Sequence, residues 1–179
     1  MKNSRKTHFL SLLAITLLAV GGSKSFAEVQ IAYPDSVNTL FTIEVPKNWK
    51  LTPTDSASKF FLVEGTKGVQ MWFRAMPVDS EKELDAAVAA AKESGREWLS
   101  ATHSDIVLDD GAFGERDGMN FISINGTGVA SGSGTKVKFI AALATLPNGS
   151  MAQLWAIIPE TAPQGERYAK KVIQSFTPR

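Results

Sequence analysis

The sequence predicts an α+β fold, in which an antiparallel β-sheet meander carries helices packed on both faces. Two observations lead to this prediction. Segments with the two-residue alternation of β-strands follow one another closely and are joined by short turns. Only two segments have the spacing of amphipathic helices, one in the middle of the chain and one at its end. Helices that are set apart from an antiparallel run of strands are typical of α+β proteins, and sheet faces that are both apolar need cover on both sides.

Residues 1–27 have the pattern of a cleavable signal peptide. Three basic residues lie among the first six, and the apolar stretch 9–20 is too short to span a bilayer comfortably. Small residues at Ser25 and Ala27 indicate cleavage after Ala27. The alternative, a retained membrane anchor, is disfavoured by the short apolar stretch. We therefore expect a periplasmic or secreted protein without stable membrane insertion after cleavage, and one domain over residues 28–179.

The composition of the expected mature chain excludes several classes of protein. Residues 28–179 hold 15 basic and 18 acidic residues, a formal charge of −3, which is unfavourable for binding nucleic acid or an anionic membrane. The chain has no cysteine. Disulfides, lipid attachment through cysteine and the usual zinc sites are therefore excluded. We expect no cofactor.

The first predicted strand, residues 40–45, alternates apolar and polar side chains from Phe41 to Val45 and is followed by Pro46 and Trp49. Proline ends a strand because it has no N–H to donate. We interpret the sequence Val-Pro-Lys-Asn-Trp as architecture, with Trp49 returning over the sheet edge to cover the end of the core. The alternative is that Trp49 is an exposed contact for a partner or ligand.

The two strands predicted next, 59–64 and 69–76, flank a Gly-Thr-Lys-Gly turn. The second of them carries Met71 and Phe73 on one face and Trp72 on the other, so both faces of the sheet need cover. After the first helix, strand patterns return and are joined by turns at Asp117–Gly118 and 147–149. These later strands are predicted at 105–109, 112–116, 119–127, 137–146 and 150–158.

A first helix is predicted over residues 80–101. Ser80 and Glu83 fit a capping box, and the alanines of the following run Ala-Ala-Val-Ala-Ala-Ala favour close approach to a sheet. Gly95 is expected to weaken this helix by about 1 kcal/mol relative to alanine. A second helix is predicted over residues 163–176. Its apolar stripe consists of Tyr168, Val172, Ile173 and Phe176.

Taken together, these features resemble the PsbP-like/DcrB-like superfamily. The resemblance rests on Phe-x-Ile-x-Val-Pro-x-x-Trp at 41–49, the alanine-rich helix, the hairpin meander and the closing Lys-Lys-Val-Ile-Gln-Ser-Phe at 170–176. It implies an α/β/α sandwich. It also implies a periplasmic or thylakoid-lumen protein that acts by binding other proteins; photosynthetic members help a membrane complex retain inorganic ions. The lipid-bearing cysteine of some members is absent here, as are the histidines expected of a transition-metal site.

Few residues in the sequence suggest catalysis or phosphate binding. His103, the one histidine beyond the leader, has only its sequence neighbours Ser104 and Asp105 as nearby partners, so we expect a surface or capping residue rather than a catalytic one. The glycine-rich stretch 126–134 leads into a strand and not into a helix, which favours a mobile hairpin loop over a phosphate loop.

The acids Asp109, Asp110, Glu115 and Asp117 lie near two turns but do not have the spacing of a calcium loop. We interpret them as solvated turn residues and retain Asp109, Asp110 and Asp117 as a weak candidate for binding. Three tryptophans are interpreted as core residues rather than sugar platforms. They are Trp72, Trp98 and Trp155.

The sequence therefore predicts a non-catalytic protein-interaction module of the cell envelope, with no catalytic, cofactor-binding or metal-binding residues and with an envelope protein as partner. One alternative is a carrier or sensor for a small ligand or ion. A second alternative is an envelope hydrolase that uses carboxylates, although no spacing in the sequence selects a pair of them.

Overall fold

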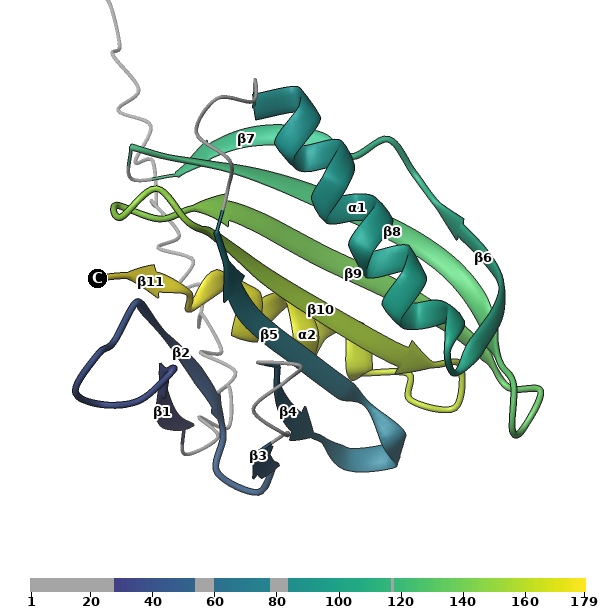
Figure 1. Cartoon of the computed structure of the whole chain (residues 1–179). Helices are drawn as coiled ribbons and strands as arrows, with labels where there is room; N and C mark the ends of the chain where they lie inside the picture. The colour runs from purple at the N-terminus through teal and green to yellow at the C-terminus, as the bar shows by residue number, and fades with distance from the viewer. Residues whose placement is uncertain (1–27, 54–59, 78–83, 117) are drawn as a thin grey trace, which may run out of the picture.

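Two antiparallel sheets and two helices make up the computed structural model, which describes residues 28–53, 60–77, 84–116 and 118–179 (Figure 1). The predicted α+β class and the antiparallel pairing are confirmed. The helices are α1 (Leu84–Ser100) and α2 (Gly165–Gln174), and a short 3₁₀ turn covers Thr66–Gly68. The strands are β1 (Glu28–Tyr33), β2 (Phe41–Pro46), β3 (Lys50–Pro53), β4 (Phe61–Glu64), β5 (Gln70–Met76), β6 (His103–Leu108), β7 (Ala112–Arg116), β8 (Met119–Ala130), β9 (Lys136–Thr145), β10 (Met151–Pro159) and β11 (Thr177–Pro178).

The large sheet has the strand order β3-β4-β5-β10-β9-β8-β6, and β7 also pairs with β8. Its centre is the predicted meander, because β8, β9 and β10 are joined by short turns and pair with their chain neighbours. Gly149 turns the chain between β9 and β10 with φ of +78°, a conformation that glycine adopts without strain. Gly118 does the same between β7 and β8, with φ of +76°, while Asp117 lies outside the described residues.

A second sheet, of order β1-β2-β11, was not expected from the sequence. β2 does not join the large sheet. It pairs instead with β1 along its whole length and with the two residues of β11. Phe41, Ile43 and Val45 are buried as predicted, and they form the inner face of this small sheet. One sheet was expected because an alternating strand reports that one of its faces is buried, but not which sheet the strand belongs to.

On one face of the large sheet, α1 lies diagonally across the central strands (Figure 1). Ala87 and Ala91 of the helix are buried against the sheet, and Gly95 lies over Trp155 of β10. A Cβ on Gly95 would come within 2.1 Å of the Trp155 ring. The sequence predicts a locally weaker helix at Gly95. This residue is therefore also a point where α1 comes close to the sheet. The predicted capping box at Ser80 and Glu83 lies outside the described residues.

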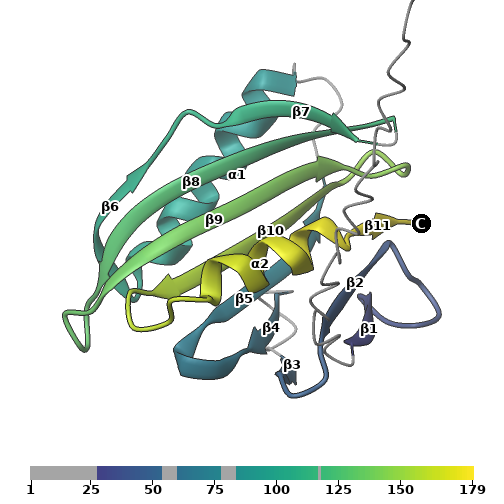
Figure 2. The same ribbon diagram turned by 180° about the vertical axis from the view of Figure 1, so that it is seen from behind.

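The opposite face is covered by α2 together with the small sheet (Figure 2). Aromatic rings dominate this core: Tyr33 stacks on Phe41 with centroids 4.9 Å apart, and the Phe73 ring of the large sheet lies 6.3 Å from Phe41. Cover on this face is therefore shared between a helix and a sheet, and the α/β/α description leaves out that second sheet.

Trp49 closes one end of this core, as the interpretation of Val-Pro-Lys-Asn-Trp predicted. It is 8% exposed, its backbone N–H donates to the Pro46 carbonyl at 2.9 Å, and its ring meets Tyr168 of α2 edge to face. Gly65 leaves room for it, since a Cβ there would lie 2.6 Å from the indole. Lys47 is exposed in the intervening turn.

The glycine-rich stretch is mostly strand, so the prediction of a loop over 126–134 is wrong. β8 continues to Ala130, and only the residues after it form the turn to β9. Gly126 and Gly128 are needed inside the strand: a Cβ on Gly126 would meet the Val107 carbonyl at 2.5 Å, and one on Gly128 would meet the Phe139 ring at 2.8 Å. Glycine in a strand can mark close approach of a neighbouring backbone as well as a turn.

Candidate functional site

Two separate hollows lie beside α2, in line along β8 and β9, over the part of the large sheet that this helix leaves open. Four cross-strand pairs of β8 and β9 form their floor, and six residue steps along β8 span about 20 Å. Figure 2 shows β8 and β9 beside α2 on this side of the sheet. We call this feature the α2 groove. Its floor pairs are Phe121 with Ala144, Ser123 with Ala142, Asn125 with Ile140, and Thr127 with Lys138.

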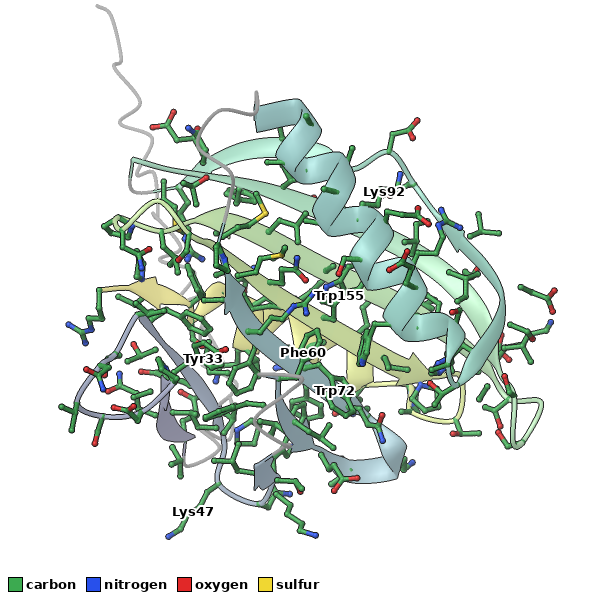
Figure 3. The ribbon with its side chains drawn as sticks, viewed as in Figure 1. Tyr33, Lys47, Phe60, Trp72, Lys92 and Trp155 are labelled. Atoms are coloured by element: carbon green, nitrogen blue, oxygen red, sulfur yellow. The ribbon has the colours of Figure 1, made fainter. Side chains whose placement is uncertain are left out.

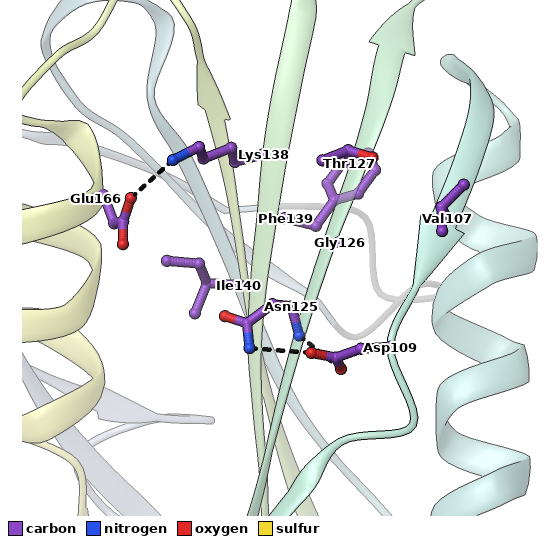
Figure 4. A pocket seen from close by; sticks show the side chains of 9 residues that line it. All are labelled: Val107, Asp109, Asn125, Gly126, Thr127, Lys138, Phe139, Ile140 and Glu166. Carbon is purple, nitrogen blue, oxygen red and sulfur yellow. Dashed lines mark hydrogen bonds and ion pairs between the residues drawn. The ribbon is translucent and has the colours of Figure 1, made fainter.

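One end of the α2 groove is a polar hollow of about 400 Å³ (Figure 4). Asp109, just after β6, accepts hydrogen bonds from the backbone N–H of Asn125 at 3.0 Å and from its side-chain amide at 3.1 Å. On the other side of the hollow, Lys138 pairs with Glu166 of α2 at 3.2 Å. Val107 lines the hollow with 65% of its surface exposed. An exposed apolar side chain thus lies at the β6 edge of the hollow, across β8 and β9 from the Lys138–Glu166 pair.

Electrostatics keep both carboxylates of this hollow ionised. Burial alone would raise the pKa of Asp109, but hydrogen bonds from Asn125 and Gly111, together with the charge of Lys92, hold that pKa below its usual value. Hydrogen bonds from Lys170 and Lys138 lower the pKa of Glu166. Neither carboxylate has the raised pKa that a general acid near neutral pH needs.

The other end of the α2 groove is an apolar hollow of about 250 Å³. It lies between Phe121 of β8 and Ile173 and Phe176 near the end of α2. Arg116 closes it, because its guanidinium donates to the carbonyls of Gln174 and Phe176, both at 2.8 Å. These bonds also tie β7 to the end of α2. The small side chain of Ser123, paired with Ala142 of the apolar hollow, lies between the two hollows.

The structure brings one of the three retained acids into this site. Asp109 lines the polar hollow. Asp110 points elsewhere and meets Lys92 of α1 at 3.5 Å, with its side chain fully exposed. Asp117 lies outside the described residues. Within the described ranges no three His, Asp or Glu side chains are grouped so that they could hold a metal ion.

Sequence reasoning missed most of the α2 groove. Val107, Thr127, Lys138 and Glu166 come from three strands and a helix, and each looks like an ordinary strand or helix residue in the sequence. One signal was available: Val107 lies in the strand 105–109 and, as an exposed apolar residue, contributes little to the core.

His103 is not a surface or capping residue, so that prediction is wrong. It begins β6 and is 9% exposed, with its ring edge-on to Phe139 at 5.4 Å and Nδ1 2.9 Å from the Thr102 hydroxyl. The strand starts two residues earlier than predicted, which turns the imidazole toward the α1 face. Burial lowers the pKa of His103, so the ring is neutral at neutral pH.

The three tryptophans differ in how deeply they are buried. Trp155 is fully buried beneath α1, as predicted for a core residue. Trp72 and Trp98 are only partly buried and form a three-ring cluster with Phe60. Their rings are 5.1 Å apart and border an opening on the α1 face.

The geometry at the α2 groove suits binding and not bond-breaking chemistry. No described nucleophile there is paired with a histidine, because His103 is on the opposite face with its ring held by Thr102 and Phe139. The ionised pairs at one end and the apolar hollow at the other instead present both polar and apolar contacts along one line. An extended polypeptide segment carries polar and apolar side chains along its length, so it can contact both ends of this line.

Comparison with known proteins defines the fold. No protein-family model and no curated protein matches the sequence. Solved structures do match it along most of its length. The solution structure of cyanobacterial PsbP (CyanoP) from Synechocystis sp. PCC 6803 has a TM-score of 0.66 at 13% identity and covers 91% of this chain and 99% of its own. The Ran-binding protein Mog1p from Saccharomyces cerevisiae has a TM-score of 0.57 at 11% identity and covers 86% of this chain and 96% of its own.

This chain therefore has the PsbP-like fold, and the resemblance noted in the sequence is confirmed at the level of the fold. Within the described residues no helix is long and apolar enough to cross a membrane.

Proposed function

We propose that this chain is a non-catalytic protein-interaction module that binds an extended segment of a partner protein in the α2 groove. The observation that carries the proposal is that the two hollows lie in line on the same pair of strands. About 20 Å of β8 and β9 joins them, with an apolar hollow at one end and two polar pairs at the other. A small ligand would fill one hollow, whereas a peptide segment can contact both.

The fold adds support. Mog1p, which has this fold, is described as Ran-binding, so a chain of this architecture can act through protein contacts. Val107 is the most exposed apolar side chain of the groove.

We further propose that residues 1–27 direct export and are removed, so that the module works in the periplasm or outside the cell with an envelope protein as partner. Cleavage after Ala27 would leave Glu28, which pairs with Pro46 in β1, as the first residue of the mature chain. The exported protein should therefore begin at Glu28 and be released by osmotic shock, which N-terminal sequencing of the released fraction checks. Recovery of Met1 in a membrane pellet would contradict export by cleavage.

Site-specific photocrosslinking in the native host tests the binding surface. A photoreactive amino acid replaces Thr127, which is exposed in the groove, or Ala89, which is exposed on α1 on the opposite face. We expect a discrete protein adduct from position 127 and none from position 89. Combining the Thr127 probe with Val107→Glu should abolish the adduct, because the charge is placed in the apolar contact.

Two kinds of result would contradict the proposed binding surface. An adduct that survives Val107→Glu would show capture without use of the groove. Adducts that form equally at both positions, or only at position 89, would place the interaction elsewhere and overturn the assignment. Circular dichroism of the variants confirms that they are folded.

A further inference from the structure

On the α1 face, one corner of the large sheet is left open beyond the end of α1. The hollow there has a volume of about 540 Å³, within the range of small-molecule sites and larger than either hollow of the α2 groove. We call it the corner pocket. Residues from β5, α1, β6, β9 and β10 line it, including Trp72, Trp98, Val137 and Ile157.

An aromatic wall borders the corner pocket. The Trp72 and Trp98 rings meet at 67° with centroids 5.1 Å apart, and Phe60 supports both, stacked 5.1 Å from Trp98 and perpendicular to Trp72 at 6.1 Å. Figure 3 shows Phe60 and Trp72 next to each other beside β5. Each ring is held by the other two. A ligand therefore finds a preformed aromatic surface and does not have to order it.

The polar groups of the corner pocket are all uncharged. Hydroxyl and amide groups from five different positions surround the apolar lining. None of the residues that line the pocket carries a charged Lys, Arg, Asp or Glu side chain. The polar lining residues are Gln70, Thr102, Ser133, Thr135 and Thr161.

The imidazole of His103 adds no charge. Its Nδ1 is engaged with the Thr102 hydroxyl at 2.9 Å, and burial lowers its pKa, so the ring stays neutral at neutral pH. An ionised ligand would give up hydration in this pocket without gaining an opposite charge, which is costly. A neutral ligand does not meet this cost.

One further donor lies in the wall. The indole N–H of Trp72 is buried and has no hydrogen-bond acceptor among the described residues. Because this N–H is closed to solvent, the hydrogen bonds of a ligand would come from the hydroxyl and amide groups that line the pocket.

We propose that the corner pocket binds an uncharged small molecule with a flat ring and with hydroxyl or amide groups at the edge of that ring. The ring packs against Trp72 and Trp98, and the edge groups bond to the surrounding hydroxyls and the Gln70 amide. This site is on the opposite face from the α2 groove. It is therefore a second site, and it does not depend on the proposed protein interaction.

NMR titration of the purified protein tests the proposal, because the chain has four tryptophans and gives four indole N–H signals. The probes are two matched pairs of equal ring size, nicotinamide with nicotinate and benzyl alcohol with benzoate. We expect saturable shifts of the Trp72 and Trp98 signals with the neutral probes, with dissociation constants in the millimolar range for molecules of this size. The carboxylates should bind about tenfold more weakly or not at all. The Trp49 signal, which belongs to the other core, should not move.

A pair of variants localises the response. Ala101→Phe places a ring at the mouth of the pocket, where Ala101 is exposed, and should abolish the shifts. Ala89→Phe makes the same change at an exposed position of α1 that does not line the pocket, and should leave them intact. Methyl β-glucoside serves as a ring that is neutral but not flat, and should bind more weakly than nicotinamide.

Three results would overturn the proposal: no saturable shift with either neutral probe, equal shifts with the carboxylates, or binding that survives Ala101→Phe. A stronger response to the glucoside than to nicotinamide would overturn the flat-ring assignment. Loss of the adduct in the crosslinking experiment has no bearing on these signals, so the two proposals fail separately.

Discussion

The two faces of the large sheet are packed in different ways. Beneath α1 the helix contributes small residues, Ala87, Ala91 and Gly95, and the sheet contributes the large rings of Trp155 and Phe139. On the other face both layers contribute large rings, with Tyr33 and Phe41 of the small sheet against the large one. A helix can approach a sheet closely only if its contact residues are small. A second sheet keeps a wider separation, which aromatic rings fill.

The α1 face also contains a network of polar side chains centred on Arg74. Arg74 of β5 donates to the Ser94 hydroxyl of α1 at 2.9 Å and to the buried Gln153 side chain at 3.3 Å. Its guanidinium lies 4.3 Å from the centre of the Phe60 ring, and burial lowers its pKa. The α1 face therefore depends on contacts with specific geometry, whereas the aromatic face depends mainly on the amount of apolar surface that is buried.

The largest effect is expected from Trp155, the largest fully buried ring of the α1 face. Trp155→Ala should lower the free energy of unfolding by about 3–5 kcal/mol, because the ring is fully buried and the glycine opposite cannot fill the cavity. Urea denaturation measures this change. Trp155→Phe should cost less, since most of the apolar surface is kept and a buried indole N–H without a described acceptor is removed. Equal losses in the two variants would contradict this account.

On the aromatic face, Trp49→Ala tests the architectural role of Val-Pro-Lys-Asn-Trp. We expect a loss of about 3–5 kcal/mol, at the lower end because Trp49 closes the edge of its core and Trp155 lies at the centre of the other. Lys47→Ala, in the exposed turn beside it, should cost less than about 0.5 kcal/mol. If Trp49→Ala left the urea midpoint unchanged but abolished partner capture, the motif would be a binding site.

Gly95→Ala sharpens the difference between helix and sheet packing. In an exposed helix this change stabilises by about 1 kcal/mol, but here the new Cβ would overlap the Trp155 ring. We therefore expect destabilisation of about 1–3 kcal/mol, as for other overpacked cores. Gly132→Ala is the matched control, because nothing lies within 4 Å of its Cβ position, and it should change stability by less than about 0.5 kcal/mol. A stabilising Gly95→Ala would show that α1 can move away from the sheet.

The Asp109 carboxylate joins the end of β6 to Asn125 of β8, and its contribution to the free energy of unfolding should depend on pH. Because its folded-state pKa is lowered, its contribution is present above the unfolded pKa of about 3.9 and is lost as the pH falls through the folded value. Asp109→Ala should therefore cost about 1 kcal/mol or less at pH 7, since solvent screens an exposed carboxylate, and nothing near pH 2. Urea midpoints at both pH values measure this, with Asp110→Ala as the control. A loss that is the same at both pH values would rule out the ionised carboxylate as the cause.

The smallest effect is expected from chelation. Melting curves with and without EDTA should coincide, because neither face of the sheet is built around a group of metal ligands within the described residues. A fall of many degrees with EDTA would point to a cation held by the acids between Asp109 and Asp117.

Local signals in the sequence predicted most of the elements. β2 and β4 to β10 were expected from alternation and turn residues, with β6 starting two residues earlier than predicted, and both helices from their apolar spacing. β1, β3 and β11 were missed because they are short or irregularly patterned. Of the α2 groove only Asp109 was anticipated, since its other residues become neighbours only through strand pairing and the docking of α2.

By itself, the sequence determined the α+β class, the positions of the helices and central strands, and the burial of Phe41, Val45 and Trp49. These depend on periodicity and turn chemistry, which act over a few residues. Only the tertiary structure decided that β2 belongs to a second sheet, that His103 is buried, and that glycine at 126 and 128 serves close strand approach. It also decided where the α2 groove and the corner pocket open. Each of these depends on which surface a segment meets, and that is set by contacts between residues far apart in the chain.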